Sequence, residues 1–294
     1  MVALSSPNIR VRNIRPDFEK DVRRHWFGGN AFTSHMIHAL SFQFPPGEAM
    51  FVRSVNHYRD KITDPQLRKA IRAFAAQESL HSKYHDEFNQ WVAQRVPEAQ
   101  AYCEAITQQI DGLYDRHAKK NPLTNLAITV ALEHMTAIMA RTFLRRSDIL
   151  DKIDPQVRAL LIWHAIEEIE HRAVAFDVFQ TVSGSYRVRV LALIMATMGL
   201  FLTTAFYQCK LLFRDGELFH GRAALEHLST TFGRNGFFTV LLGSYFDFFR
   251  RDFHPLQHQD NELIEEWSHK LKDLVPVQIM GKSDAEGEAK GVPA

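Results

Sequence analysis

The chain has 294 residues, 46% of them hydrophobic, so it can bury a substantial core in one large domain or two small ones. It carries 35 basic and 34 acidic residues, and its net charge of +1 excludes the strongly basic character that favours nucleic acid as a partner. Phenylalanine is abundant (22 residues) while glycine (14) and proline (11) are sparse, a balance that favours long helices over a strand-and-turn fold.

The first half of the chain shows repeated helical spacing of apolar residues. Residues 1–20 are predicted to form an extended N-terminal arm. A helical pattern runs over residues 30–44, where Pro45 and Pro46 interrupt it. Because proline is tolerated in the first turn of a helix, we expect a second helix to begin at once. The next helix is predicted to run from residue 65 to about residue 96.

Further helices are predicted over residues 97–120, 121–146 and 155–183, each beginning beside a proline. No alternating strand pattern of any length is found in the sequence. The predicted fold is therefore all-α, with a helical bundle over residues 21–183.

The C-terminal part is dominated by apolar helical patterns. Residues 190–209 are twenty residues without a charge, long enough to span a bilayer, and residues 236–249 form a shorter apolar run. Two interpretations stay open: the extension over residues 184–280 packs on the bundle, or it contacts a membrane. The polar tail over residues 281–294 is predicted to be disordered.

The stretch HAIEEIEH concentrates five charged or titratable side chains in one predicted helix. A helix advances about 100° per residue, so His164, Glu168 and His171 lie within about 60° of each other on one face. Glu167 borders that face and is a candidate outer partner. Glu170 points elsewhere, is expected to be solvated or paired, and its replacement by alanine is expected to be nearly silent.

A second stretch repeats the same spacing. Glu78 and His81 form a Glu-x-x-His pair, as do Glu168 and His171. An isolated glutamate in an apolar helix precedes each pair: Glu48 before the first and Glu133 before the second. His85, four residues after His81, is either a further ligand, a partner behind the ligands or a surface histidine.

Two copies of this unit predict a four-helix bundle that holds two metal ions in its core. A single Glu-x-x-His pair arises often by chance as a surface ion pair or a satisfied core histidine. Two matched copies, each with a carboxylate in apolar surroundings, are hard to explain otherwise, because an unpaired buried carboxylate is costly. The mixed nitrogen and oxygen donor set suits two iron ions, or manganese with iron, better than zinc.

The motifs FPPGE (Phe44–Glu48), FAAQESLHSKYH (Phe74–His85) and WHAIEEIEHRAVAFDV (Trp163–Val178) carry a family resemblance. The chain resembles the ferritin-like di-iron carboxylate superfamily, and more closely a bacterial family described as predicted metal-dependent hydrolases. The resemblance covers roughly residues 20–250 and implies a ferritin-like four-helix bundle with additional C-terminal apolar helices.

The spacing of His164, Glu168 and His171 is also similar to that of arylamine N-oxygenases, a di-iron group with a third histidine. This likeness does not extend to the rest of the chain. The ligand set it implies here is Glu48, Glu78, His81, Glu133, His164, Glu168 and His171. Glu48 departs from the pattern because it follows Pro-Pro-Gly near a helix start, which either holds it at the metals or shifts it away.

The leading hypothesis for function is a non-haem di-iron oxidase or oxygenase that activates O2 and acts on a small, largely apolar organic substrate. The first alternative is a two-metal hydrolase on the same bundle, and the second is a ferroxidase or iron-binding protein. A protein docked on a membrane with purely structural metals is a further possibility.

The sequence also bears on partners and location. The isolated cysteines Cys103 and Cys209 and the lack of an apolar leader favour a cytoplasmic protein, in contact with the inner face of the membrane if residues 190–209 bind lipid. No reductase segment is evident, so oxidative chemistry requires a separate electron donor or electrons from the substrate. The oligomeric state is open, and a dimer is plausible.

Overall fold

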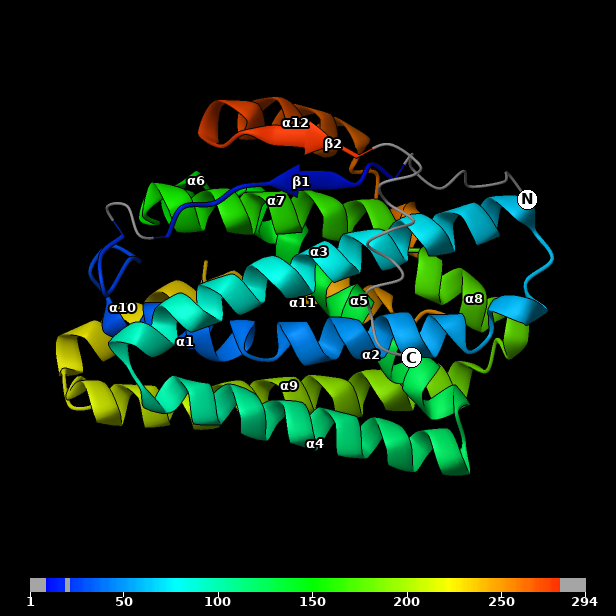
Figure 1. The fold of residues 1–294 in the computed structure, drawn as a ribbon, viewed down its shortest axis with the longest axis horizontal. Coiled ribbons are helices and arrows are strands. Elements are labelled where there is room, and N and C mark those ends of the chain that lie inside the picture. Colours follow the sequence, from blue (N-terminus) through cyan, green and yellow to red (C-terminus); the bar gives the residue numbers. More distant parts are fainter. Residues whose placement is uncertain (1–8, 19–21, 281–294) are drawn as a thin grey trace.

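The computed structural model describes residues 9–18 and 22–280, and the described part is predominantly helical, as predicted (Figure 1). The predicted tail over residues 281–294 and, in the predicted arm, residues 1–8 and 19–20 lie outside the described residues. The α-helices are α1 (Ala31–Ser41), α2 (Phe44–Asn56), α3 (Pro65–Arg95), α4 (Glu98–Lys120), α5 (Leu123–Leu144), α6 (Ser147–Leu150), α7 (Pro155–His171), α8 (Val174–Val182), α9 (Tyr186–Asp215), α10 (Gly221–Phe232), α11 (Phe237–Asp247) and α12 (Asn261–Leu274). The short 3-10 helices η1 (Arg59–Lys61) and η2 (Pro255–Gln257) lie in connecting segments.

Helices α2, α3, α5 and α7 form the central bundle, with α2 on α3, α5 on α7, and the two pairs in contact with each other. Proline occupies the first turn of α2, α3 and α7, where the missing N–H has no helical partner to lose. The side chain of Asp64 caps α3 by accepting a hydrogen bond from the N–H of Gln66 at 2.8 Å. Local sequence signals therefore set the starts of the helices that carry the site.

The predicted continuous helix over residues 155–183 is interrupted in the structure. Helix α7 ends at His171 and α8 begins at Val174. The buried guanidinium of Arg172 donates hydrogen bonds to the carbonyl oxygens of Ile169, Pro255 and His258. By bonding the carbonyl oxygen of Ile169, in the last turn of α7, it stabilises the interruption of the helix directly after His171.

Two short strands accompany the helices, although the sequence shows no alternating strand pattern. Strands β1 (Arg12–Ile14) and β2 (Val277–Ile279) pair in antiparallel register and bring the two ends of the described chain together (Figure 1). Strands of three residues are too short to show an alternating pattern. Their position matters, because β1 lies against α7 and Arg12 is buried there.

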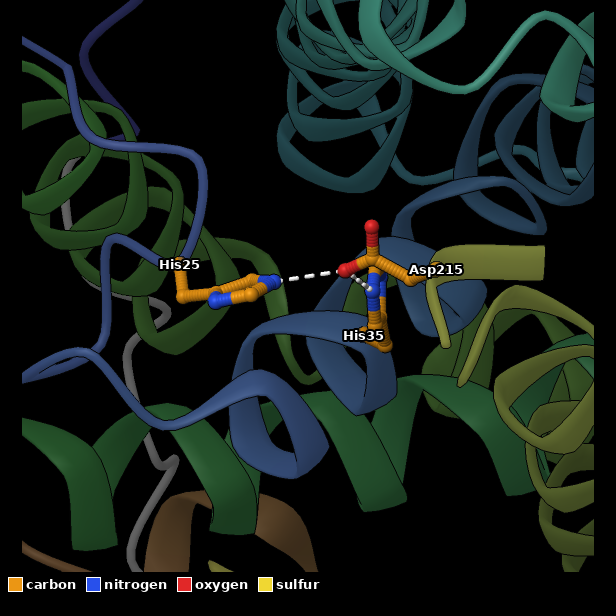
Figure 2. A group of neighbouring side chains, drawn as sticks. All are labelled: His25, His35 and Asp215. Atoms are coloured by element: carbon orange, nitrogen blue, oxygen red, sulfur yellow. Dashed lines mark hydrogen bonds and ion pairs between the residues drawn. The ribbon is translucent and has the colours of Figure 1, made fainter. Parts of the chain in front are cut away.

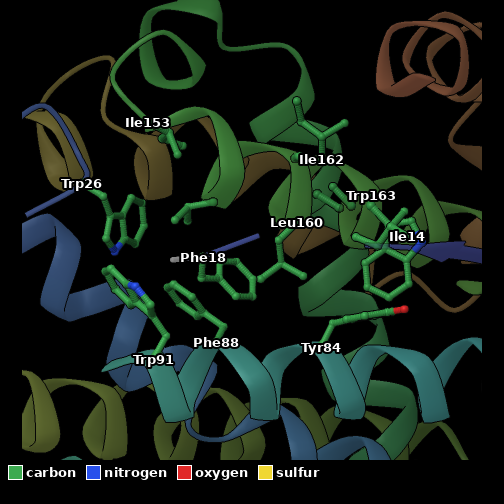
Figure 3. Close-up of a cluster of buried hydrophobic side chains, with 14 of the residues drawn as sticks. Ile14, Phe18, Trp26, Tyr84, Phe88, Trp91, Ile153, Leu160, Ile162 and Trp163 are labelled. Atoms are coloured by element: carbon green, nitrogen blue, oxygen red, sulfur yellow. The ribbon is translucent and has the colours of Figure 1, made fainter. Parts of the chain in front are cut away.

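Large buried side chains surround the polar centre of the bundle. One cluster gathers Trp26, Phe88, Trp91 and Trp163 between α3, α7 and the N-terminal segment (Figure 3). The ring of Trp163 lies 4.8 Å from that of His81, edge to face. In a second cluster, the ring of Phe74 lies 5.0 Å from that of His171. The histidines of the centre are thus walled in by aromatic core on two sides.

The C-terminal helices α9, α10 and α11 form a layer outside the bundle. Helix α9 packs on α1 and α5, α10 on α1, and α11 on α5. Two described helices, α5 and α9, are long and apolar enough to cross a membrane. They differ in burial: 72% of the apolar window of α5 is buried inside the protein, against 22% for α9. Helix α5 is therefore a core helix, and α9 keeps an exposed apolar side.

Candidate metal centre

The seven candidate ligands come together at one point between the four central helices. Helix α2 contributes Glu48, α3 contributes Glu78 and His81, α5 contributes Glu133, and α7 contributes His164, Glu168 and His171. All seven side chains are buried. Glu48 lies in the first turns of α2, and its Oε1 still reaches to 3.9 Å from His164 Nε2. The early position of Glu48 therefore holds it at the centre.

The ligand atoms divide into two overlapping groups. His171 Nε2 lies 3.2 Å from Glu78 Oε1, 3.4 Å from Glu133 Oε2 and 3.4 Å from Glu168 Oε2. His81 Nδ1 lies 3.9 Å from Glu78 Oε2 and 3.5 Å from Glu168 Oε1.

His164 Nε2 completes the second group, 2.8 Å from Glu168 Oε1 and 3.9 Å from Glu48 Oε1. Glu78 and Glu168 each turn one oxygen toward His171 and the other toward His81. These two carboxylates lie between the groups, as bridging ligands do.

Many of these atoms have no hydrogen-bond partner among the described residues. They are Glu48 Oε1, both oxygens of Glu78, both oxygens of Glu133, Glu168 Oε2, His81 Nδ1 and His171 Nε2. A buried polar atom without a partner costs about 1–3 kcal/mol of folding free energy. So many unpartnered atoms in one place therefore indicate a bound ligand that offsets this cost. Two ligands at about 2.1 Å from one metal and at right angles lie about 3 Å apart, close to the observed spacings.

The carboxylates of the centre differ in pKa. Burial, followed by the charges of neighbouring carboxylates, raises the pKa of Glu48, Glu78 and Glu133 well above the ordinary range. Burial also acts on Glu168, but the charge of His171 and hydrogen bonds from the surrounding histidines hold its pKa well below the ordinary range. Without a bound cation, burial therefore favours the neutral form of Glu48, Glu78 and Glu133, while the histidines favour the charged form of Glu168.

Two of the histidines are oriented by hydrogen bonds on the side of the ring that points away from the centre. His81 Nε2 lies 3.1 Å from Glu167 Oε2, and His171 Nδ1 lies 3.1 Å from Gln77 Oε1. Each outer partner accepts the ring N–H and leaves the opposite nitrogen lone pair for the centre. The predicted role of Glu167 as a bordering partner agrees with this geometry. Gln77 was missed, although it is a polar residue in the apolar run before Glu78.

A chain of hydrogen bonds fixes the tautomer of the third histidine. Ser41 Oγ donates to Asn89 Oδ1 at 2.7 Å, so it accepts from His85 Nδ1 at 2.9 Å. His85 Nε2 is then an acceptor, and His164 Nδ1 donates to it at 2.6 Å. In this tautomer His164 Nε2, which lies 2.8 Å from Glu168 Oε1, keeps the lone pair that a cation bound at the centre would use. Of the roles proposed for His85, the geometry favours that of a partner behind a ligand.

Of the two states expected for Glu170, solvated or paired, the structure shows the paired one. Its side chain is buried, and it receives two hydrogen bonds from the Arg12 guanidinium, at 2.6 and 2.9 Å. The same guanidinium lies 3.4 Å from Glu167 Oε1, and the backbone N–H of Arg12 donates to that oxygen at 2.8 Å. The helical angle correctly pointed Glu170 away from the ligands, but nothing local to α7 showed that β1 supplies its partner.

An apolar cavity of about 150 Å³ reaches the centre from the side of α1, α5 and α7. His164 and Glu168 are the only charged or titratable side chains in its wall, and the remaining lining comes from residues such as Phe44, Met139, Leu161 and Phe238. The hydroxyls of Thr136 and Thr231 in this wall already donate to backbone carbonyls. The cavity therefore offers no free charge other than the centre itself.

A second group of titratable residues, outside the bundle centre, joins the N-terminal segment to α1 and α9. Asp215 Oδ2 lies 2.6 Å from His25 Nε2 and 2.9 Å from His35 Nε2 (Figure 2), and Oδ1 is paired with Arg24. Behind it, Trp26 Nε1 donates to His38 Nε2 at 2.7 Å.

The donation from Trp26 fixes the remaining protons. His38 must donate from Nδ1 to His35 Nδ1, at 3.2 Å, which leaves the His35 proton on Nε2 for Asp215. Burial, with the charges of His25 and Arg24, lowers the pKa of His35 to about 3, consistent with a neutral ring. His35 Nε2 thus has no lone pair to offer a metal, and we interpret the group as a structural hydrogen-bond chain.

Replacing Asp215 with asparagine is expected to destabilise the protein by about 2 kcal/mol, because charged hydrogen bonds to a buried carboxylate are lost. Urea denaturation measures the change in unfolding free energy. Asp252→Asn is the matched control, since the Asp252–Arg250 pair is largely exposed. Equal stability of the two variants would contradict the structural role of the chain.

A family model described as "Predicted metal-dependent hydrolase" matches residues 10–259. The chain belongs to this family. The match includes all seven candidate ligands and the α9–α11 layer. No curated protein and no solved structure matches the chain. Membership in a metal-dependent family agrees with the buried histidine and glutamate clusters in the bundle.

Proposed function

We propose that the protein is a two-metal enzyme whose ions are held by the seven candidate ligands. His171 and Glu133 would hold one ion, and His81, His164 and Glu48 would hold the other. Glu78 and Glu168, which lie between the two groups, would serve both ions. The observation that carries this proposal is the set of buried, unpartnered oxygen and nitrogen atoms that face one another. Two divalent cations would balance the charge of all four ionised carboxylates.

Hydrolysis is the reaction that the family description favours. When bound, a pair of metal ions lowers the pKa of a water molecule and polarises a substrate carbonyl or similar group. The protein's part is to orient the ligands and to exclude bulk water. The fixed tautomer of His164 and the aromatic walls beside His81 and His171 serve these purposes.

The substrate class follows from the cavity. Its apolar wall places a substrate against His164 and Glu168, on the side of the ion that His81 and His164 would hold. The volume of about 150 Å³ suits a benzene-sized or short alkyl group. An ionised substrate would lose its hydration there without gaining a partner. We therefore propose a small, uncharged, largely apolar substrate.

Filling the cavity tests the substrate site separately from the metals. Ala140→Phe places a ring in the cavity wall on α5, and we expect it to weaken binding of iodobenzene, measured by titration calorimetry, by about 10-fold or more. Metal content, measured by elemental analysis, should not change. Ala101→Phe, at an exposed position of α4, is the matched control. Unchanged iodobenzene affinity in Ala140→Phe would show that the cavity is not the binding site.

O2-dependent oxidation is the second candidate function, and the donor set favours it. Four carboxylates and three histidines form the mixed oxygen and nitrogen environment that suits iron, and the cavity wall beside them is mostly apolar. This reaction would need a separate electron donor or electrons from the substrate. A ferroxidase function shares the centre but gives the apolar cavity no role.

Metal identity and O2 dependence separate the two candidates. If the enzyme is a hydrolase, hydrolysis of a small neutral ester such as phenyl acetate proceeds without O2, and it is lost in His171→Ala. If the enzyme is an oxidase, the purified protein contains iron, consumes O2 after reduction and leaves the ester intact. Ester hydrolysis that survives in His171→Ala would come from another site and would contradict the hydrolase proposal.

A further inference from the structure

The outer layer of the protein exposes an unusual amount of apolar surface. Among the described residues, every exposed large apolar side chain except Leu113 and Ile279 lies between Leu191 and Phe246. On α9 these side chains follow one stripe: Leu191, Met195, Met198, Leu202, Phe206 and Phe213. The stripe spans about 33 Å at the helical rise of about 1.5 Å per residue. Exposed apolar patches of this extent mark sites of protein or membrane interaction.

The neighbouring helices continue this surface. The ring centroids of Phe201 on α9 and Phe238 on α11 lie 4.9 Å apart. Gln208 Nε2 on α9 lies 3.3 Å from His227 Nε2 on α10, so the three helices are adjacent. Exposed side chains on α10 and α11 include Leu225, Leu228, Phe232, Val240 and Phe246. Because the inner sides of α9, α10 and α11 rest on α1 and α5, their outer sides form one face, which we name the apolar face.

The apolar face adjoins the cavity at the metal centre. Thr230, Thr231, Phe237 and Phe238, at the turn between α10 and α11, form part of the cavity wall. Phe238 stacks at 5.3 Å on Phe232, which is 54% exposed on the apolar face. One layer of side chains therefore separates the outer surface from the substrate cavity.

Basic residues are in excess around the apolar face. Residues 186–251 contain the basic side chains Arg187, Arg189, Lys210, Arg214, Arg222, Arg234, Arg250 and Arg251, against the acidic Asp215, Glu217, Glu226 and Asp247. Within the described part of the chain, Arg187, Arg234 and Arg251 have no carboxylate partner. Unpaired arginines beside an apolar stripe complement an anionic lipid surface.

Helix α9 cannot leave the protein to span a bilayer. Its inner stripe, which includes Leu193, Tyr207 and Leu211, is buried in the protein core. Arg189 is also buried, and its guanidinium donates to the backbone carbonyl of Arg250 at 2.7 Å. A helix with one buried side and one exposed apolar side fits the surface of a membrane, parallel to its plane.

We propose that the apolar face docks on an anionic lipid bilayer and that the enzyme takes its substrate from the bilayer past the turn between α10 and α11. The docking step depends only on the exposed apolar side chains and the arginines beside them. The substrate step rests on the proposed function, because it assumes that the cavity holds the substrate. The substrate class then becomes a neutral apolar molecule dissolved in lipid.

Vesicle flotation tests the docking. Met198→Glu combined with Leu202→Glu places two charges on the exposed stripe without touching the core, and Leu113→Glu on α4 is the matched control. We expect the parent and the control to float with vesicles that contain phosphatidylglycerol, and the double variant to bind about 100-fold more weakly. Arg187→Gln with Arg234→Gln should weaken binding about 10-fold or more on these vesicles, with little change on pure phosphatidylcholine.

Two results would overturn the docking proposal. One is equal flotation of the parent and the double variant. The other is a parent dimer in light scattering that the double variant converts to a monomer, with no vesicle binding by either, since the face would then bind a second copy of the chain. The same flotation is measured on metal-free His171→Ala. If the parent protein docks on vesicles but binds no metal, the proposed function has failed. If it binds metal but does not dock, the docking proposal has failed.

A brominated hydrocarbon tests the path of the substrate. In Phe238→Trp, a tryptophan replaces a ring of the cavity wall, while Trp26, Trp91 and Trp163 are fully buried elsewhere and provide a constant background. The fourth tryptophan, the partly buried Trp267 on α12, is replaced by phenylalanine in every variant of this test. Vesicles loaded with 1-bromononane should quench the new tryptophan. Quenching should fall about 10-fold when Met198→Glu and Leu202→Glu are added. Equal quenching in both backgrounds would contradict access from the bilayer and leave the docking intact.

Discussion

Replacing Glu133 with glutamine is expected to remove metal binding while leaving the metal-free fold almost unchanged. Burial raises the pKa of Glu133 well above its ordinary range and so favours the neutral carboxyl group in the metal-free protein, and glutamine is a neutral group of the same shape. The unfolding free energy of the metal-free protein should therefore change by less than about 1 kcal/mol. In the metal-bound state Glu133→Gln lacks one ionised oxygen donor, so its metal affinity should fall by at least about 100-fold.

Chelator competition measures the metal affinity, and urea denaturation in the presence of chelator measures the stability. Glu87→Gln, at an exposed position of α3, is the matched control and should match the parent in both. Glu48→Gln should behave like Glu133→Gln, because the pKa of Glu48 is raised by the same burial. Parent-like metal affinity in Glu133→Gln would show that this residue is not a ligand.

Replacing Glu170 with alanine is expected to destabilise the protein by about 3–5 kcal/mol, although Glu170 is not a candidate ligand. The variant leaves the buried Arg12 guanidinium without its main partner, and it also removes an acceptor for Gln77 Nε2 at 3.1 Å. Since Gln77 and Glu167 orient His171 and His81, we also expect weaker metal binding, by about 10-fold.

Urea denaturation of Glu170→Ala measures the loss of unfolding free energy. Glu104→Ala, at an exposed position of α4, is the matched control. Arg12→Met combined with Glu170→Leu removes both charges together and should recover part of the loss, because the buried Arg12 charge is no longer left without its main partner. A loss below about 1 kcal/mol in Glu170→Ala would show that the buried ion pair is not important for stability.

The sequence was informative wherever the signal was local. Helical spacing and the position of prolines located the four bundle helices, since both depend on neighbours within a few residues. The same spacing brought His164, Glu168 and His171 to one face, and the repeated Glu-x-x-His pair brought in Glu78 and His81. The structure places all of these side chains together. Their assignment as ligands stays a proposal.

The parts that sequence could not supply depend on distant contacts. Arg12 lies 155 residues from Glu167 and reaches it through a three-residue strand that has no visible pattern. The interruption after His171 depends on bonds from Arg172 to residues beyond position 250. The role of His85 depends on Ser41 of another helix. Nor could any local signal show that a cavity joins the metal centre to the apolar helices.

The most direct test of the central claim is anomalous X-ray diffraction from crystals of the purified protein, with elemental analysis of the same sample. We predict two metal ions per chain, bridged by Glu78 and Glu168, with His171 and Glu133 on one ion and His81, His164 and Glu48 on the other. No anomalous peak between these side chains after loading with iron or manganese, or a single zinc ion bound elsewhere, would contradict the account.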